Sequence, residues 1–203
     1  MPYKPVILDD SFTRTDPGRP HVPQGFYLAD VASVIPTAEN YDKTPGYTFN
    51  FRILEGPDNA PAAGRNREIP RYGAMSERAQ FGVAGILGAL GQGDLARAIF
   101  AQYGGKPLPY ETFVKIGKFI ESKVKGGKVI LTIGDEISPQ GRSFSSVLEV
   151  GAYTPDEWAA KRKEALVGGM NGTGPQPTGA VAPASGGSLA DQVSAMFEQP
   201  DVN

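Results

Sequence analysis

The chain of 203 residues contains no cysteine, one histidine and one tryptophan. Without cysteine it can form neither a disulfide framework nor a thiolate metal site. The single histidine, His21, lies in a proline-rich stretch, and because Cys and His are the usual zinc ligands, no metal site is expected. A nucleophilic triad needs a base, and the sequence assigns no neighbour to this histidine. The sequence therefore indicates neither an enzyme nor a cofactor.

Long apolar runs are also missing. No run approaches the roughly 20 residues that a membrane-spanning helix needs. The first residues, MPYKPVILDD, lack the basic-then-apolar pattern of a signal peptide. We therefore expect a cytoplasmic protein with no membrane segment, encoded by a bacterium or by a virus that infects one.

Basic residues are absent after Lys163. Residues 168–187 are a Gly/Pro/Ala tract, which predicts a flexible linker, and residues 188–203 are an acidic and apolar tip. Single-stranded-DNA-binding proteins often use such a tip to recruit other proteins, whereas a terminus without a role fits the composition equally well. The candidate partner-binding residues of the tip are Asp191, Met196, Phe197, Glu198 and Asp201.

The part of the chain before this tail, residues 1–167, is close to neutral, because all 20 basic residues lie in it together with most of the 22 acidic ones. This is not the strong positive excess of a protein that binds duplex DNA. A nucleic-acid contact would need a local basic groove combined with base stacking. The same balance of charge also suits a capsid or assembly protein.

The body, residues 25–167, follows an irregular arm of residues 1–24 in which Val6–Leu8 could form a short strand. Alternating patterns predict strands at about 25–36, 47–54 and 67–72, the last at a sheet edge because of Pro70. In the first strand Tyr27, Ala29, Val31 and Ile35 share a face. The apolar face of the second strand is predicted to lie in the core, although it could also be a platform for base stacking. Thr48, Asn50 and Arg52 of the same strand then face outward. The apolar residues of that second strand are Tyr47, Phe49, Phe51 and Ile53.

Helical spacing predicts helices from the N-cap Ser76 to Gly91, at 94–103 and at 110–124. The third carries Lys115, Lys118 and Lys123, which we interpret first as a solvated face. A hairpin of 128–136 and 143–153 follows. One face of its first strand carries Val129, Leu131 and Ile133, and one face of its second carries Phe144, Leu148 and Val150. Thr154 and Pro155 open a last helix through Val167, and 189–197 could form a short helix.

Five strands with helices between the third and fourth predict a β-rich α+β fold, specifically an OB-fold-like five-stranded antiparallel barrel. An antiparallel sheet of another topology, packed by helices, fits the pattern almost as well. In an OB fold the second and third strands and two loops line the ligand groove. Guanidinium groups suit that position because they bind phosphates bidentately and stack on bases, although arginines of an ordinary surface fit as well. The candidate nucleic-acid-binding residues are Lys43, Asn50, Arg52, Arg65, Arg67, Arg71, Tyr72 and Arg142.

A series of short motifs between residues 24 and 152 resembles a family of phage proteins, long known only as a domain of unknown function and often encoded among recombination and replication genes. The motifs are Gly25 with Tyr27, Ile53-Leu54-Glu55-Gly56, Gly64-Arg65, Leu90-Gly91, and Gly127-Lys128-Val129 followed by Gly141 and Val147. The resemblance implies a single-stranded-DNA-binding role on an OB-like barrel.

Two functions from different classes follow. The first is a phage single-stranded-DNA-binding protein that coats single strands in replication or recombination and recruits partner proteins through its tip. Such a protein could also form a homo-oligomer. The alternative is a virion structural or assembly protein, such as a capsid-decoration or scaffold component, for which the proline-rich arm and the long tail are also suited.

Overall fold

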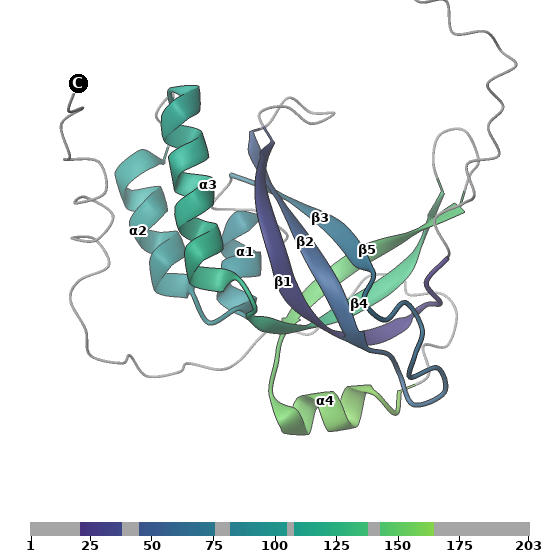
Figure 1. Cartoon of the computed structure of the whole chain (residues 1–203). Coiled ribbons are helices and arrows are strands. Elements are labelled where there is room, and N and C mark those ends of the chain that lie inside the picture. The colour runs from purple at the N-terminus through teal and green to yellow at the C-terminus, as the bar shows by residue number, and fades with distance from the viewer. Residues whose placement is uncertain (1–20, 38–44, 76–81, 105–107, 138–142, 165–203) are drawn as a thin grey trace, which may run out of the picture.

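A computed structural model describes residues 21–37, 45–75, 82–104, 108–137 and 143–164 (Figure 1). The arrangement of the elements confirms the predicted β-rich α+β class, with helices inserted between the third and fourth strands. Along the chain the elements are β1 (Gly25–Thr37), β2 (Gly46–Glu55), β3 (Glu68–Ala74), α1 (Val83–Ala89), α2 (Gly93–Tyr103), α3 (Tyr110–Val124), β4 (Lys128–Ile137), β5 (Ser143–Ala152) and α4 (Pro155–Lys161). The predicted strand at Val6–Leu8 and the predicted helix at 189–197 lie outside the described residues.

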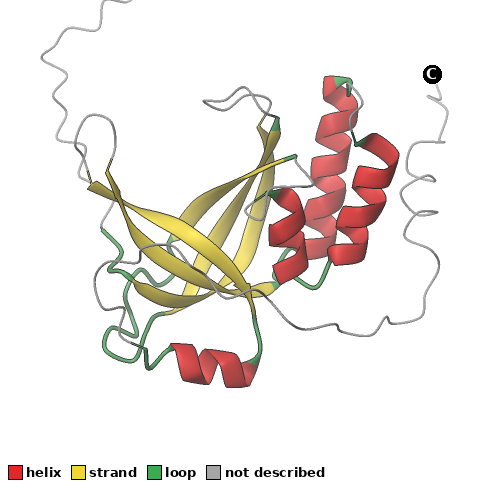
Figure 2. Ribbon diagram, turned by 180° about the vertical axis from the view of Figure 1, so that it is seen from behind, coloured by secondary structure: helices red, strands yellow, loops and turns green. Residues whose placement is uncertain are grey.

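The described strands form one antiparallel sheet in the order β3-β2-β1-β4-β5. Strand β1 is central, and its Asp30 lies opposite Arg52 of β2 on one side and Lys128 of β4 on the other. The sheet is strongly curved (Figure 2), so that β3 and β5, which end the hydrogen-bonded order, come close to each other. Pro70 lies in β3, at one end of that order, as its missing N–H predicts.

The alternation in β2 decides which side of the sheet is buried. The side chains of Tyr47, Phe49, Phe51 and Ile53 are fully buried, whereas Arg52 on the other side is exposed, which confirms the core interpretation. The predicted inner residues Tyr27, Ala29 and Val31 of β1, and Val129, Leu131 and Ile133 of β4, belong to the same core. Burial of each large side chain contributes about 1.5–3 kcal/mol.

A β-bulge in β1 corrects one predicted face. The register with β2 shifts between Val31 and Ser33, and the inward–outward alternation restarts one residue later. As a result Val34 is buried opposite Phe49, and Ile35, which the sequence predicts to point inward, is 50% exposed.

A second bulge does the same in β5. Opposite Thr132 and Ile133 of β4 the register skips Leu148, so that Val147 lies across from Ile133 and is fully buried. Phe144, predicted to share one face with Leu148 and Val150, is exposed. Leu148 lies over Gly134, where an added Cβ would come within 2.5 Å of the leucine side chain, so a larger residue at this position would displace Leu148.

Helix α3 closes one end of the curved sheet and has the predicted bounds. Phe113, Ile116 and Ile120 are buried against the sheet, and Tyr47 stacks on Phe113 with a ring-centroid distance of 4.6 Å. The Tyr47 hydroxyl also donates a 2.9 Å hydrogen bond to the Phe113 carbonyl. At Gly117 an added Cβ would lie 2.8 Å from the Tyr47 ring, so the close approach of helix and strand depends on this glycine.

Helices α1 and α2 pack on each other beside α3 (Figure 1). Helix α2 matches its predicted span. Helix α1 is shorter than predicted, because Gly82 is extended and forms its N-cap, so Ser76, which lies outside the described residues, is not the cap of this helix.

Helix α4 begins as the sequence predicts. The Thr154 hydroxyl accepts a 3.1 Å hydrogen bond from the Glu157 N–H, and Pro155 occupies the first helical position. The helix ends at Lys161 rather than at Val167. Its one buried residue, Trp158, packs on the outer side of the sheet against Phe26 and Leu28 of β1 and Ile130 of β4.

Candidate nucleic-acid interface

The outer side of the sheet is divided into two parts. Helix α4 lies along one part (Figure 1), where Trp158 seals a small apolar cluster on β1 and β4. The other part is formed by β3, by the second half of β1 and by the outward residues of β2 up to Arg52. The contacts of α4 with β2 lie beyond this part, at Leu54 and Glu55. We call this second part the open face. The register places on it Ser33, Ile35 and Thr37 of β1, Thr48, Asn50 and Arg52 of β2, and Glu68, Pro70 and Tyr72 of β3.

Polar side chains of the open face are held by bonds between strands. The Asn50 amide donates a 2.9 Å hydrogen bond to the Ser33 hydroxyl, and the hydroxyls of Thr37 and Thr48 lie 2.9 Å apart. Ile35, placed outward by the bulge, lies directly across from Thr48. The face therefore offers ordered hydroxyl and amide groups around an exposed aliphatic side chain.

Arg52 lies on the open face but already has an anionic partner. Its Nη2 and Nε atoms lie 2.5 and 3.1 Å from the two carboxylate oxygens of Asp30, a bidentate pair. The hydrogen bond to Asp30 raises the pKa of the guanidinium above its ordinary value. The pair neutralises the positive charge expected here, so the half-exposed guanidinium offers mainly a planar surface for stacking.

Arg71 does not share a face with Arg52 and Tyr72, which corrects the single wall expected from the sequence. It lies opposite Phe49, and cross-strand partners point to the same side, so it faces inward. Burial lowers the pKa of its guanidinium, and the nearby Glu136 carboxylate partly opposes this shift. Alternation along β3 therefore separates Arg71 from its neighbour Tyr72.

Tyr72 is the aromatic side chain of the open face and lies opposite Thr48. It is half-buried, because its ring crosses the start of β2: a Cβ at Gly46 would come within 2.6 Å of the phenol oxygen. The glycine leaves room for the hydroxyl end of the ring beside the backbone of β2. A fixed, partly exposed ring is what base stacking requires.

Arg65 and Arg67 lie in the connection between β2 and β3. This segment turns through left-handed residues, Gly64 with φ of 65° and Asn66 with φ of 64°, and the Asn66 N–H donates to the Ile53 carbonyl. Arg65 is exposed beside the turn, whereas Arg67 is half-buried. The candidates Lys43 and Arg142, and the five candidate residues of the tip, lie outside the described residues.

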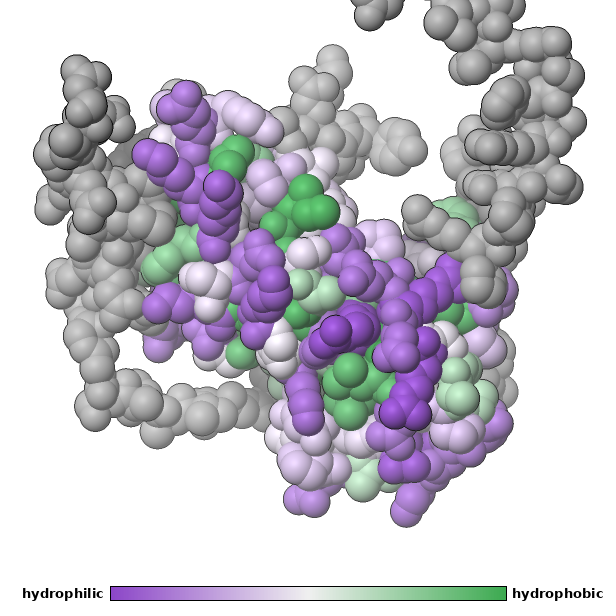
Figure 3. Space-filling model, viewed as in Figure 1, coloured by the Kyte–Doolittle hydropathy of each residue, from purple (hydrophilic) through white to green (hydrophobic). Residues whose placement is uncertain are grey.

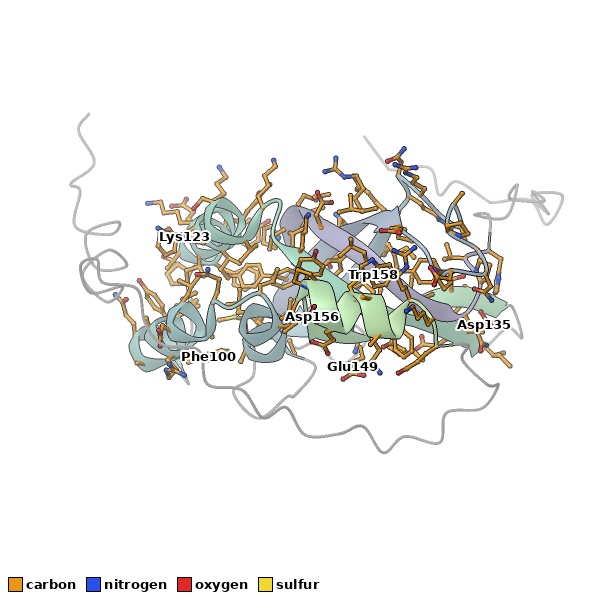
Figure 4. The ribbon with its side chains drawn as sticks, turned by 90° about the horizontal axis from the view of Figure 1, so that it is seen from below. Phe100, Lys123, Asp135, Glu149, Asp156 and Trp158 are labelled. Carbon is orange, nitrogen blue, oxygen red and sulfur yellow. The ribbon has the colours of Figure 1, made fainter. Side chains whose placement is uncertain are left out.

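Asp135, near the end of β4, has partners in the segment that precedes β1. One carboxylate oxygen of Asp135 lies 2.6 Å from Nε2 of His21, and the other accepts a 3.1 Å hydrogen bond from Gln24. Figure 4 shows Asp135 at the opposite end of the molecule from Phe100 of α2. Within the described ranges, no group of three or more His, Asp or Glu side chains could hold a metal ion.

Sequence reasoning missed Ser33, Ile35 and Thr37. The only signal was the strand itself, and the bulge that turns these residues outward has no mark in the alternation pattern. In the described part of the chain, no helix has the length and apolar character needed to cross a membrane. No protein-family model matches this chain, and a search of curated proteins finds no match.

Proposed function

We propose that the protein is a single-stranded-DNA-binding protein of a bacteriophage, with an OB-fold-like barrel as its DNA-binding body. The order β3-β2-β1-β4-β5, with helices between β3 and β4 and with β3 near β5, is compatible with a partly open five-stranded barrel. The motifs that resemble the phage family support the same fold.

One observation carries the proposal. In an OB fold the ligand lies across the second and third strands. Here α4 occupies the part of the outer side built from Phe26, Leu28 and Ile130, and it leaves the part built from β3 and from residues 48–52 of β2 free. Among the described residues, the surface that α4 leaves uncovered is thus the one that an OB fold uses.

The chemistry of the open face favours single strands over duplex. Tyr72 offers a stacking surface, which tolerates any base sequence. Asn50 and the hydroxyls around it offer hydrogen bonds, while the Asp30–Arg52 pair keeps the local charge low. The phosphates of a duplex would contact few cations on this face, whereas the bases of a flexible single strand can stack on the Tyr72 ring.

The acidic tip completes the proposal. Met196 and Phe197 stand among acidic residues and offer an apolar anchor with a charge of fixed sign for a replication or recombination protein. The tip is separate from the DNA-binding body in sequence, so the two activities can be tested apart.

Anisotropy of a labelled dT oligonucleotide of about 30 residues tests the proposal directly. We expect saturable binding at about 50 mM salt that weakens as salt rises, because phosphate contacts release counterions, and weaker binding to a duplex of equal length. Absence of any anisotropy change with the single strand would refute it. Intrinsic fluorescence is a poor substitute, because the single tryptophan, Trp158, is buried between α4 and the sheet, away from the open face.

The alternative function, a virion structural or assembly protein, has one observation in its favour. Ile137 and Phe144 lie near the end of the β4–β5 hairpin and are 76% and 45% exposed. Exposed apolar side chains at a projecting hairpin suit contact with another protein. Assembly into particles without any DNA binding would favour this function.

A further inference from the structure

Helix α3 presents a basic face to solvent. Lys115, Lys118 and Ser122 follow one another at spacings of three and four residues, so they lie on one side of the helix, and all three are exposed. Neither Lys115 nor Lys118 has an ion-pair partner among the described residues. Two adjacent lysines without a partner repel each other at a cost to the helix.

Two further lysines and an aromatic ring lie beside this basic face. Lys123 lies 5.3 Å from the centre of the half-buried Phe119 ring, which gives an aromatic group beside the cations. Lys125 is held by Glu121 at 3.4 Å. A solvated helix surface usually alternates charges at i and i+4. Helix α3 begins with such a pair, Glu111 and Lys115, and a second pair, Glu121 and Lys125, spans its end; among the described side chains only the second forms an ion pair.

The basic face adjoins the open face. Helix α3 packs on the end of β1, where the Cβ position of Gly117 lies 3.7 Å from the Pro36 ring, and Pro36 follows the exposed Ile35. Figure 4 shows Lys123 on the side of α3 that lies away from Phe100 of α2. Figure 3 shows hydrophilic side chains over α3 on the side of the molecule that presents β1 and β2 in Figure 1.

We propose that Lys115, Lys118 and Ser122 of α3 bind the phosphate backbone of a single strand that continues from the open face past Ile35. This inference rests on the proposed function and extends its footprint. Stacking on Tyr72 holds the bases at one end of the path, where the local charge is low, and α3 supplies the cations at the other. Lys115 to Ser122 spans about 10 Å along the helix, enough to follow a strand over several ångströms beyond the sheet.

The test compares full-length Lys115→Gln/Lys118→Gln with a matched control, Arg97→Gln/Lys163→Gln, which removes two charges from exposed positions on α2 and after α4. Binding of dT oligonucleotides of about 8 and about 30 residues is measured by anisotropy over a range of salt. For the longer strand the lysine variant should bind about 5–10-fold more weakly at low salt, and its log–log salt slope should fall by about 1.4, since each phosphate contact on a single strand contributes about 0.7. The control and a Lys115→Arg/Lys118→Arg variant should keep the wild-type slope.

The two proposals fail differently. If the wild-type protein binds neither oligonucleotide, the proposed function fails. If it binds both but the lysine variant keeps the wild-type affinity and slope for the longer strand, only the α3 path is overturned. An equal loss for both lengths would also overturn it, because the lysines would then belong to the primary contact. Melting temperatures equal to that of the wild type check that both variants are folded.

Discussion

Arg52 of β2 and Arg71 of β3 lie on paired strands but on opposite sides of the sheet. Arg52 faces outward and is held by a bidentate contact to Asp30, whereas Arg71 faces inward towards Glu136. Residues with the same chemistry therefore cannot be grouped by their distance along the sequence. On the open face it is Tyr72, rather than an arginine cluster, that we expect to contribute most to binding.

Replacement of Tyr72 tests this expectation. Tyr72→Leu keeps an apolar side chain over Gly46 but removes the ring, so the affinity for single-stranded dT should fall by about 1–3 kcal/mol, the usual contribution of one stacked base. The melting temperature should change little. Tyr110→Leu, at an exposed tyrosine of α3, is the matched control and should keep wild-type affinity. Equal affinities of the two variants would show that Tyr72 does not stack on DNA.

Phe51 tests the opposite face of the same sheet. Phe51→Ala should lower the free energy of unfolding by about 3–5 kcal/mol, because the side chain is fully buried and its loss leaves a cavity. Urea titration followed by circular dichroism measures the change. The folded fraction should bind DNA as the wild type does, and a stable variant that no longer binds would mean that the ligand lies on the inner face.

Two buried tyrosines predict how stability depends on pH. Burial raises the pKa of Tyr27 to about 12 and raises that of Tyr47 further, and both hydroxyls donate hydrogen bonds, to Pro23 and Phe113 carbonyls. In the unfolded chain these phenols lose their protons near pH 10 while the folded protein keeps them. Stability should therefore be complete below pH 10 and fall as pH rises towards 12, by at most about 2–3 kcal/mol for Tyr27.

Urea unfolding at several values between about pH 9 and about pH 11.5 would measure this loss in the free energy of unfolding. Tyr27→Phe should be less stable at neutral pH, because the bond to Pro23 is gone, but should show a weaker fall at high pH. A variant that declines as steeply as the wild type would place the titrating groups elsewhere.

At the scale of elements, α4 is a short helix held by its ends and by one aromatic residue. Its start is fixed by the Thr154 cap, and after its last turn Arg162 lies 2.5 Å from Asp58 and 3.1 Å from Glu55. The hydrogen bond to Asp58 raises the pKa of Arg162 above its ordinary value. Seven helical residues are too few to be stable alone, so these contacts decide whether α4 stays on the sheet.

Arg162→Ala should loosen α4. Trp158, the single tryptophan, is the buried residue of this helix, and its indole N–H donates to Glu55 at 3.3 Å, so its emission reports directly on docking. We expect a red shift and greater acrylamide quenching than in wild type, with the overall fold retained. The neighbouring exposed Lys163→Ala is the control and should leave the emission unchanged. An unchanged spectrum for Arg162→Ala would mean that the apolar cluster alone holds the helix.

At the scale of the whole molecule, the described body carries its own core and the tip is linked to it through a Gly/Pro-rich tract. Deletion of residues 168–203 should leave the melting temperature unchanged, because such a composition buries little surface. DNA affinity should hold or increase, since three acidic residues are removed, and co-purification of a replication or recombination partner should be lost. Charge-preserving Met196→Ser/Phe197→Ser should lose the partner while DNA affinity stays at the full-length value. A marked fall in melting temperature on deletion would show that the tail is part of the folded body.

The sequence by itself determined the order of the elements, the buried face of β2, the span of α3 and the cap of α4. Each of these depends on local periodicity or on a few adjacent residues, such as Thr154 and Pro155, whose preferences do not need distant partners. Helix α1 is shorter than the sequence predicts, because Gly82 adopts an extended conformation and the helix begins only after it.

Tertiary structure alone decided the composition of the candidate site. Bulges in β1 and β5 arise from how two strands match across the sheet, and they moved Ile35 and Phe144 outward and Val34 and Val147 inward. Likewise, the pairing of Arg52 with Asp30 joins residues 22 positions apart, and the place of α4 on the outer side depends on a contact between Trp158 and β1. Register and long-range packing set these features, because a shift of one residue in a strand turns every following side chain to the other face.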